Sequence, residues 1–419
     1  MIHLLQISDI HFHAFPGEDE DEFANMRERF FDDLDYVRDN LDAIDTVLIC
    51  GDIAFSGKRK EYEKANDFIK TTLVKLTKGG SDPDVFMVPG NHDKDRDNHE
   101  QTRYLLNTKL TCADQDSANK FFNSIRAKEV STLKILYAPF TEYNNFASIY
   151  SSADDIANSI INEQPVDGKN VYSKRLLCNL GEYAVSLIGL NSALCCDKND
   201  YPSKEPASGH KQFLPKVACN QVRKKYEIFI SLMHHPLHDY VLNGDKLQTE
   251  FDNRFNVQLF GHIHKQSSFA DNTVKIYSGA LQPDVIDEKD YFPVYNIISL
   301  DVEGSELKVD IKARKWNGTA FVNYPEGSAS HSITLAPVNT WTADEKKNAV
   351  ETKQAVVDMD KKYRIQKRFM ECAERKRRSL MDEYGYGYDN EKSDITNSML
   401  FIKTIEANGK LDELEQKIS

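Results

Sequence analysis

The sequence has few features that would place the chain in a membrane or in an oxidising compartment. It contains no apolar run long enough to cross a bilayer, and its first residues lack the basic region and cleavage site of a signal peptide. The seven cysteines are odd in number and scattered, without a C-x-x-C spacing, which argues against a disulfide framework. We therefore expect reduced thiols, no membrane segment and a cytoplasmic location.

The chain also lacks an excess of positive charge. The formal net charge of the 419 residues is -13, which opposes indiscriminate binding of nucleic acid by the whole surface but permits a local basic groove. Hydrophobic residues make up 40% and charged residues 28%, as in an ordinary globular protein. The length favours two or three structural units.

Apolar strand-like runs alternate with amphipathic helical stretches in the first half of the chain. Helical periodicity covers 26–40 and 60–76, between strand-like runs at 2–7, 46–50 and 84–88. Further strand-like runs follow at 171–177, 183–190, 227–233, 257–260, 274–277, 295–300 and 307–313. This order predicts an α/β (α+β) fold in which two mixed β-sheets pack face to face, flanked by helices.

Two polar, helical regions lie outside this pattern. Residues 95–169 carry no strong strand pattern, and we interpret them as a helical insertion in a main domain spanning 1–337. Residues 338–419 form a C-terminal helical extension, with a long charged helix over 342–382 and a second helical stretch after it. Such thin apolar stripes need something to pack on. We expect these helices to pack on the main domain, on each other, or on a second copy or partner protein.

Five short polar blocks follow strand-like runs. They are Asp9-Ile10-His11, Gly51-Asp52, Gly90-Asn91-His92-Asp93, Met233-His234-His235-Pro236 and Gly261-His262-Ile263-His264. The carboxyl ends of strands are where α/β sheets place their sites. Carboxylates, imidazoles and one amide, without a thiolate, suit divalent ions such as Mn, Fe, Zn or Ni. A pair of cations about 3.5–4 Å apart could share a bridging hydroxide and neutralise a phosphate ester, and a bidentate Asp52 on its tight turn could bridge the pair.

The ordered set D-x-H, G-D, G-N-H-D, H-H-P and G-H-x-H resembles the calcineurin-like metallophosphoesterase superfamily over roughly the first three quarters of the chain. The resemblance implies the metallophosphoesterase fold and two divalent metal ions, with Mn favoured. It implies that Asp9, His11, His264 and Asp52 hold one cation, and that Asp52 bridges to a second cation held by Asn91, His234 and His262. His92 is expected to act on the bound phosphate, with Asp93 fixing its tautomer, so the catalytic set is His92, Asp93 and Asp52.

The implied activity is a metal-dependent phosphoric ester hydrolase in which a metal-bridging hydroxide attacks the phosphorus. We expect a phosphodiester substrate, either a cyclic nucleotide or a nucleic acid. One alternative is a DNA or RNA nuclease acting with a partner protein. Another is a scaffold that keeps the fold without catalysis, although such relatives usually lose a ligand position and this chain has lost none.

Several other residues leave a structural and a functional interpretation open. For His235 the two are equally favoured, whereas His13 and Asn191-Ser192 have structural roles as the simpler interpretation. Cys195-Cys196 is interpreted as two half-buried thiols. The run from Lys361 to Arg378 holds nine basic and two acidic residues; it is either a contact for nucleic acid or, as we slightly favour, a solvated helix face balanced by acidic neighbours.

Overall fold

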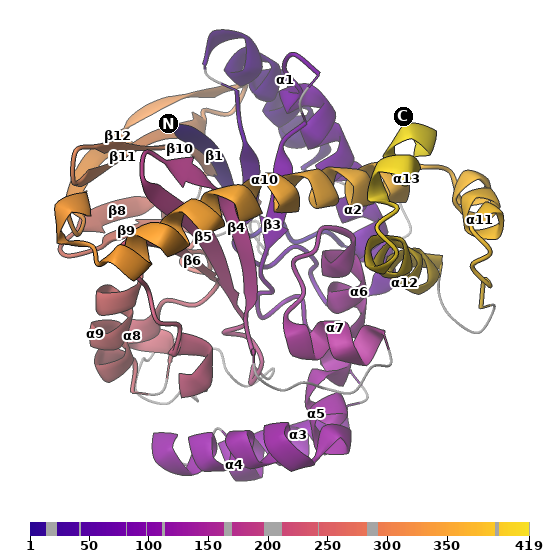
Figure 1. Cartoon of the computed structure of the whole chain (residues 1–419). Coiled ribbons are helices and arrows are strands. Elements are labelled where there is room, and N and C mark those ends of the chain that lie inside the picture. Colours follow the sequence, from indigo (N-terminus) through magenta and orange to yellow (C-terminus); the bar gives the residue numbers. More distant parts are fainter. Residues whose placement is uncertain are drawn as a thin grey trace.

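Two six-stranded mixed β-sheets packed face to face form the centre of the molecule (Figure 1). We describe them from a computed structural model of the whole chain. The structure describes residues 1–13, 23–41, 43–80, 82–97, 99–110, 114–162, 170–196, 212–241, 243–282, 292–389 and 394–418. Figure 1 shows helices lying outside the two sheets, which confirms the predicted layers.

The first sheet has the strand order β12-β11-β10-β1-β2-β3. Its strands are β1 (Ile2–Ile7), β2 (Thr46–Ile49), β3 (Asp84–Met87), β10 (Val294–Glu303), β11 (Glu306–Trp316) and β12 (Phe321–Thr334). β1, β2 and β3 are parallel, and β10 joins β1 in the antiparallel sense. The carboxyl ends of β1, β2 and β3 therefore lie at the same edge of the sheet.

The second sheet has the order β4-β5-β6-β7-β9-β8. Its strands are β4 (Ser173–Leu180), β5 (Tyr183–Leu190), β6 (Glu227–Met233), β7 (Val257–Phe260), β8 (Ser267–Ala270) and β9 (Val274–Tyr277). β5, β6, β7 and β9 run parallel, while β4 and β8 are antiparallel edge strands. The parallel strands are buried on both faces, which explains their nearly continuous apolar sequence.

Alternation along the strands divides the core into two layers. In β1, Leu4 belongs to the apolar cluster between the sheets, whereas Leu5 and Ile7 point to the cluster under the helices. The helices covering that second cluster include α1 (Ala24–Asn40) and α2 (Arg59–Leu76), which pack side by side. Their buried faces carry Phe30 and Phe68, whose rings stack at 5.5 Å.

The predicted insertion is mostly helical in the part that the structure describes. It contains α3 (Glu100–Leu105), a π-helical turn (Leu106–Leu110), α4 (Gln115–Lys128), α5 (Val130–Tyr137), a 3-10 turn (Ala138–Phe140), α6 (Thr141–Ile149) and α7 (Asp155–Ile161). Short helices follow in the second half, namely α8 (Leu237–Tyr240) and α9 (Gly244–Arg254), with 3-10 turns at Lys216–Cys219 and Val338–Thr340.

The C-terminal extension is helical, as expected, and it has an apolar cluster of its own. α10 (Ala343–Glu371) runs along the outside of β4 and β5, and α11 (Glu374–Glu383), α12 (Asp394–Ala407) and α13 (Leu411–Ile418) pack around its far end (Figure 1). Trp341 and Ala349, however, belong to the cluster between the sheets. The division at residue 337 stays a prediction. No described helix is both long enough and apolar enough to cross a membrane.

One predicted helix needs correction, and two strands were missed. The helix predicted over 342–382 is interrupted at Cys372 and Ala373, where the backbone is extended. β8 and β12 were not predicted, because both are half-exposed strands rich in polar residues. Pairing with neighbouring strands, which the sequence does not display, outweighs their weak strand propensity.

Candidate metal centre

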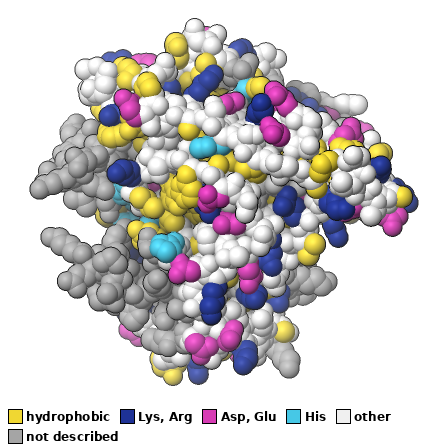
Figure 2. All heavy atoms as spheres, turned by 90° about the vertical axis from the view of Figure 1, so that its left-hand side faces the viewer, with side chains coloured by type: hydrophobic (Ala, Val, Ile, Leu, Met, Phe, Trp, Pro, Cys, Tyr) yellow, Lys and Arg dark blue, Asp and Glu magenta, His cyan; other side chains and the backbone are white. Residues whose placement is uncertain are grey.

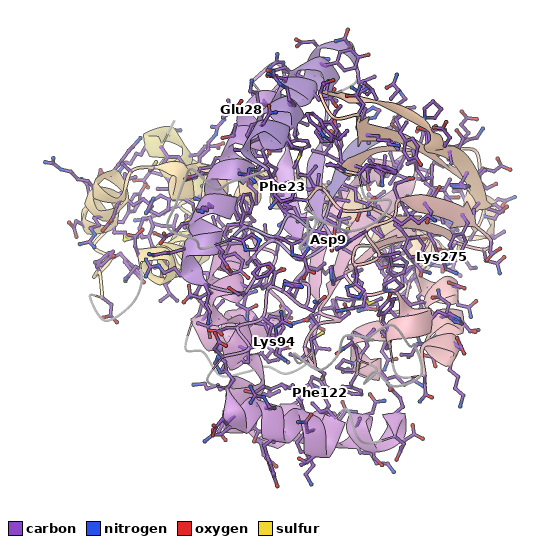
Figure 3. All side chains as sticks on the ribbon, turned by 180° about the vertical axis from the view of Figure 1, so that it is seen from behind. Asp9, Phe23, Glu28, Lys94, Phe122 and Lys275 are labelled. Carbon is purple, nitrogen blue, oxygen red and sulfur yellow. The ribbon has the colours of Figure 1, made fainter. Side chains whose placement is uncertain are left out.

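The five polar blocks meet at the carboxyl ends of β1, β2, β3, β6 and β7. Figure 3, which views the molecule from behind Figure 1, shows Asp9 near the middle of the structure, above Lys94. Four sets of three side chains have candidate ligand atoms within 4.8 Å of one another. Those sets are Asp9, His11 and His264; Asp9, Asp52 and His234; His11, Asp52 and His92; and His234, His235 and His262.

Close contacts join the carboxylates of the cluster to its imidazoles. His264 Nε2 lies 3.2 Å from Asp9 Oδ1, and His234 Nε2 lies 3.2 Å from Asp52 Oδ2. His11 Nε2 lies 4.0 Å from a carboxylate oxygen of each aspartate, between the two. Thus Asp52 reaches toward ligands on both sides, as a bridging carboxylate must.

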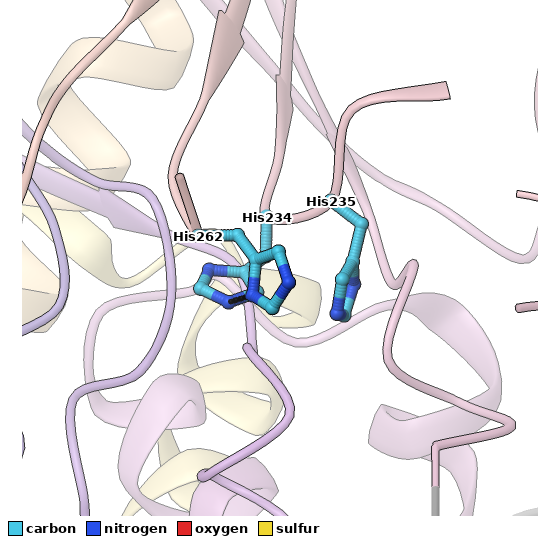
Figure 4. A group of neighbouring side chains, drawn as sticks. All are labelled: His234, His235 and His262. Carbon is cyan, nitrogen blue, oxygen red and sulfur yellow. Dashed lines mark hydrogen bonds between the residues drawn. The ribbon is translucent and has the colours of Figure 1, made fainter. Parts of the chain in front are cut away.

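His234 joins the remaining predicted ligands to this group. Its Nε2 lies 3.1 Å from Asn91 Oδ1 and 3.2 Å from Nδ1 of His262. On the other side of the ring, Nδ1 donates to the backbone carbonyl of Cys50 at 2.8 Å, which turns Nε2 toward the cluster. Figure 4 shows the rings of His234 and His262 in contact, with the ring of His235 beside them. All seven residues predicted to bind metal therefore lie in one cluster.

The backbone is strained where it presents these side chains. Among the described residues, seven other than glycine have a positive φ, and five of the seven are predicted ligands. These are Asp9, His11, Asp52, His262 and His264, with φ between 49° and 67°. Residues with a Cβ rarely adopt this region, and such strain is concentrated at functional sites. The strained backbone at these positions thus points the ligand side chains toward one another. The energetic cost of this conformation is offset by the surrounding fold.

Glycines allow the blocks to approach one another closely. A Cβ built on Gly90 would lie 2.1 Å from Asp52 Oδ1, and one built on Gly51 would lie 2.6 Å from His234 Nδ1. Gly261 is equally confined, because its Cβ would lie 2.2 Å from Ser8 Oγ. Three of the five blocks therefore carry a glycine that makes room for a residue from another segment of the site.

Burial and neighbouring charges shift the pKa values of the predicted ligands. Burial lowers the pKa of His11 and of His262 to about 3, so both rings are neutral. Burial raises the pKa of Asp52, but His234 and His92 outweigh it and hold that pKa well below its usual value. Burial would lower the pKa of His234, yet the Asp52 carboxylate raises it to about 9. Divalent cations bind ionised carboxylates and neutral imidazoles. His11 and His262 already have the neutral form, whereas a cation at His234 would displace the proton that Asp52 stabilises on that ring.

Unsatisfied polar atoms provide a test of whether cations fit here. Both ring nitrogens of His11 are buried without a hydrogen-bond partner among the described residues. Burying such groups unpaired costs free energy. For His11, which is 1% exposed, a cation between Asp9 and Asp52 would satisfy the ring. The donor set and its gaps fit divalent ions, whose identity and number the geometry leaves open.

The structure corrects the role predicted for Asp93. His92 Nδ1 lies 2.7 Å from the carbonyl oxygen of Phe55, so that carbonyl fixes the ring instead of Asp93. The Asp93 carboxylate accepts hydrogen bonds from the backbone N–H groups of Ile53, Ala54 and Gly90, and from the hydroxyl of Tyr62. Asp93 therefore ties together the loops after β2 and β3, because three backbone donors converge on it. Meanwhile Asp52 Oδ1 accepts from the backbone N–H of His92 at 2.8 Å.

His235 supports the cluster from one side. Its Nδ1 lies 3.0 Å from Ser192 Oγ, and its ring centroid lies 4.4 Å from that of His262. Ser192 Oγ also accepts from the backbone N–H of His235 at 3.0 Å. The Sγ of Cys196 lies 3.8 Å from His235 Nε2. Ser192 and Cys196 thus contact a residue of the site, a role that the simpler interpretation of their sequence did not assign to them.

Sequence reasoning missed Gln282 and Arg27 altogether. The backbone N–H of Gln282 donates to the carbonyl of Asp9 at 2.9 Å, and its side chain donates to the carbonyl of His11 at 3.3 Å. Arg27 Nη1 in turn donates to Gln282 Oε1 at 2.8 Å. These two residues hold the first block in place. They are 255 positions apart in the sequence, so the sequence gives no local signal of their contact.

The fold and the cluster of predicted ligands are those of one known protein family. The family model for calcineurin-like phosphoesterases matches residues 2–266, and the chain belongs to that family. The chain is also 25% identical over 328 residues to the metallophosphoesterase-like protein YydB of Bacillus subtilis. That alignment covers 75% of this chain, and the chain spans 60% of the length of YydB.

Solved structures of Vps29 are similar in outline. A single mutant from Entamoeba histolytica is 12% identical with a TM-score of 0.31, covering 80% of this chain and 100% of that chain. The protein from Cryptosporidium parvum is 12% identical with a TM-score of 0.33, covering 80% and 98%. At these values the likeness carries no argument about function.

Proposed function

We propose that this chain hydrolyses phosphodiesters with the help of two divalent cations. One cation would be held by Asp9, His11, His264 and Asp52, and the other by Asp52, Asn91, His234 and His262. The observation that carries the proposal is the meeting of these seven side chains, from five separate strand ends, with their ligand atoms turned toward one another. Once bound, the cations would supply Lewis acidity and a hydroxide nucleophile at neutral pH.

The chain's own groups would orient and protonate. Because Nδ1 of His92 is occupied by the Phe55 carbonyl, a protonated His92 has Nε2–H to donate toward the leaving oxygen. Asp93 would act at a distance by clamping the two loops that carry Asp52 and His92. Both roles require rigid loops rather than a mobile lid.

Mn is the cation we favour. Fe, Zn and Ni stay as alternatives, because all four accept carboxylate and imidazole ligands. The sharpest test is Asp52→Asn assayed with bis-p-nitrophenyl phosphate after loading with Mn. The variant should bind fewer than two cations per chain and lose turnover. His331→Asn is the matched control, since His331 lies on β12 and contacts Ser268. Full turnover by Asp52→Asn would overturn the proposed mechanism.

The nuclease alternative gains little from the basic run at Lys361–Arg378. Lys361 and Lys362 form ion pairs with Asp412 and Glu406, and Arg377 pairs with Asp394. These pairs support the interpretation of the run as a helix face balanced by acidic neighbours. Figure 2 shows the side of the molecule away from these helices, and on that face too Lys and Arg side chains are interspersed with Asp and Glu rather than gathered. A panel of cyclic nucleotides and polynucleotides would separate the two substrates.

The scaffold alternative is tested by metal content alone. A protein that only keeps the fold should take up less than one divalent cation per chain after Mn loading. We expect two. A homodimer or partner protein at the C-terminal helices, and a cytoplasmic location, stay predictions.

A further inference from the structure

Three aromatic rings form a row at one side of the metal centre. The rings of His13 and Phe55 lie 4.0 Å apart between centroids at an angle of 32°, and Phe55 and His92 lie 5.3 Å apart at 40°. His92 itself meets His11 edge to face at 4.7 Å. The row thus leads from a predicted ligand, past the residue expected over the phosphate, to Phe55 and His13.

The backbone holds this row in place. The N–H of Phe12 donates to the carbonyl of Ile53, and the N–H of Phe55 donates to the carbonyl of Phe12, both at 3.0 Å. These bonds fix the segment after β1 against the segment after β2. The position of the Phe55 ring therefore follows from the same loops that position Asp52 and His92.

The placement of Phe55 is not explained by core packing alone. Phe12 is only 5% exposed and belongs to the core cluster under the helices, whereas His13 and Phe55 are half-buried and lie outside the described core clusters. A half-buried phenylalanine in ring contact with His92 leaves some apolar surface beside a highly polar centre, next to the residue expected over the phosphate.

We propose that His13 and Phe55 form an aromatic shelf that binds a planar ring of the substrate, such as a nucleobase. The inference rests on the proposed function, since it assumes that a phosphate sits beside His92. Aromatic side chains accept nucleobases by stacking, and they do so with little regard to base identity. The shelf would favour nucleotide phosphoesters over those of sugars or other aliphatic alcohols.

The test compares two ligands that share a phosphate and differ in the base. The Mn-loaded protein is titrated calorimetrically with AMP and with ribose 5-phosphate. We expect AMP to bind the wild-type chain at least about tenfold more tightly than ribose 5-phosphate. Phe55→Leu and His13→Ala should each bring the two affinities within about threefold of one another, while the affinity for ribose 5-phosphate stays unchanged. Phe55→Leu keeps the backbone carbonyl that orients His92.

Phe269→Leu is the matched control, because Phe269 is also a partly exposed ring (44%), stacked on Tyr277 at 6.0 Å on β8 and β9. It should leave both affinities unchanged. Equal affinities in the wild-type chain, or an AMP preference that survives both shelf substitutions, would overturn the shelf. If the two shelf substitutions weaken the binding of AMP and of ribose 5-phosphate equally, the rings position His92 instead of binding a base, and the shelf is also overturned. Binding is measured without turnover, so failure to hydrolyse any diester would refute the proposed function and leave the shelf separately tested.

Discussion

At the scale of single residues, the backbone holds the metal centre as firmly as the side chains do. A Cys50 carbonyl orients His234, and a Phe55 carbonyl orients His92. Each bond occupies one ring nitrogen and thereby directs the other, which fixes the tautomer that a ligand or a general acid needs. The orientation of both histidines therefore depends on the backbone of the loops that carry Cys50 and Phe55. Substituting a ligand side chain would not test this contribution.

His92→Asn should lower kcat for bis-p-nitrophenyl phosphate about a hundredfold or more, because general acid catalysis typically contributes factors of about 10²–10⁴. Metal content should stay at the wild-type value, since His92 is not a predicted ligand. The measurement is steady-state kinetics together with elemental analysis of the loaded protein. Unchanged kcat would remove His92 from the mechanism.

Away from the site, a buried ion pair joins α1 to β11. Arg314 pairs with Asp33, both about 6% exposed, and Tyr295 donates to the same carboxylate. Asp33→Ala should lower the free energy of unfolding by about 3 kcal/mol or more, because it leaves a buried charge without its partner.

Urea denaturation measures this loss. Arg38→Ala is the comparison, because Arg38 pairs with Asp35 and Asp39 at a more exposed position and should cost under about 1 kcal/mol. Equal effects of the two substitutions would show that burial of the Asp33 pair contributes nothing.

At the scale of elements, the glycines between strands and loops decide how close the blocks can come. Gly90 begins the loop after β3, and the loop after β2 presents Asp52 directly against it. Gly80, by contrast, has a φ of 78° and would carry a Cβ with no atom within 4 Å. Gly90 is thus needed for the space that its missing side chain leaves, whereas Gly80 is needed only for its left-handed backbone conformation.

Gly90→Ala should displace Asp52 and reduce Mn uptake and turnover together, because its Cβ would overlap the carboxylate. Gly80→Ala should leave activity unchanged and cost about 1 kcal/mol of stability through its backbone conformation. Metal analysis, kinetics and thermal unfolding of both variants decide the matter. Normal metal uptake by Gly90→Ala would contradict the close approach.

At the scale of the whole molecule, the C-terminal extension is divided between two clusters. Its beginning packs into the body, where the ring of Trp341 meets that of Tyr183 edge to face at 5.2 Å. Its end surrounds a separate cluster that includes Ile365, Phe369 and Phe401. Lys353 also pairs with Glu182 in the turn between β4 and β5.

Two truncations should therefore behave differently. Removal of 357–419 deletes the separate cluster and should leave hydrolysis of small diesters within about twofold of the full chain. Removal of 338–419 also deletes Trp341 and Ala349, and it should lower Tm by several degrees, because burying one large aromatic side chain is worth about 3 kcal/mol. Thermal unfolding and kinetics of both chains measure the difference; an identical Tm would contradict it.

The sequence by itself determined the layers of the fold and the members of the cluster. Apolar runs marked most strands, and the order of five polar blocks indicated all seven predicted ligands, because both signals are local. β8 and β12 escaped prediction, since their stability comes from neighbouring strands rather than from their own residues. Only the tertiary structure decided that Phe55 rather than Asp93 orients His92, and that Gln282 and Arg27 support the first block. Contacts between residues far apart in the chain depend on how the loops pack, and that packing leaves no periodic signal in the sequence.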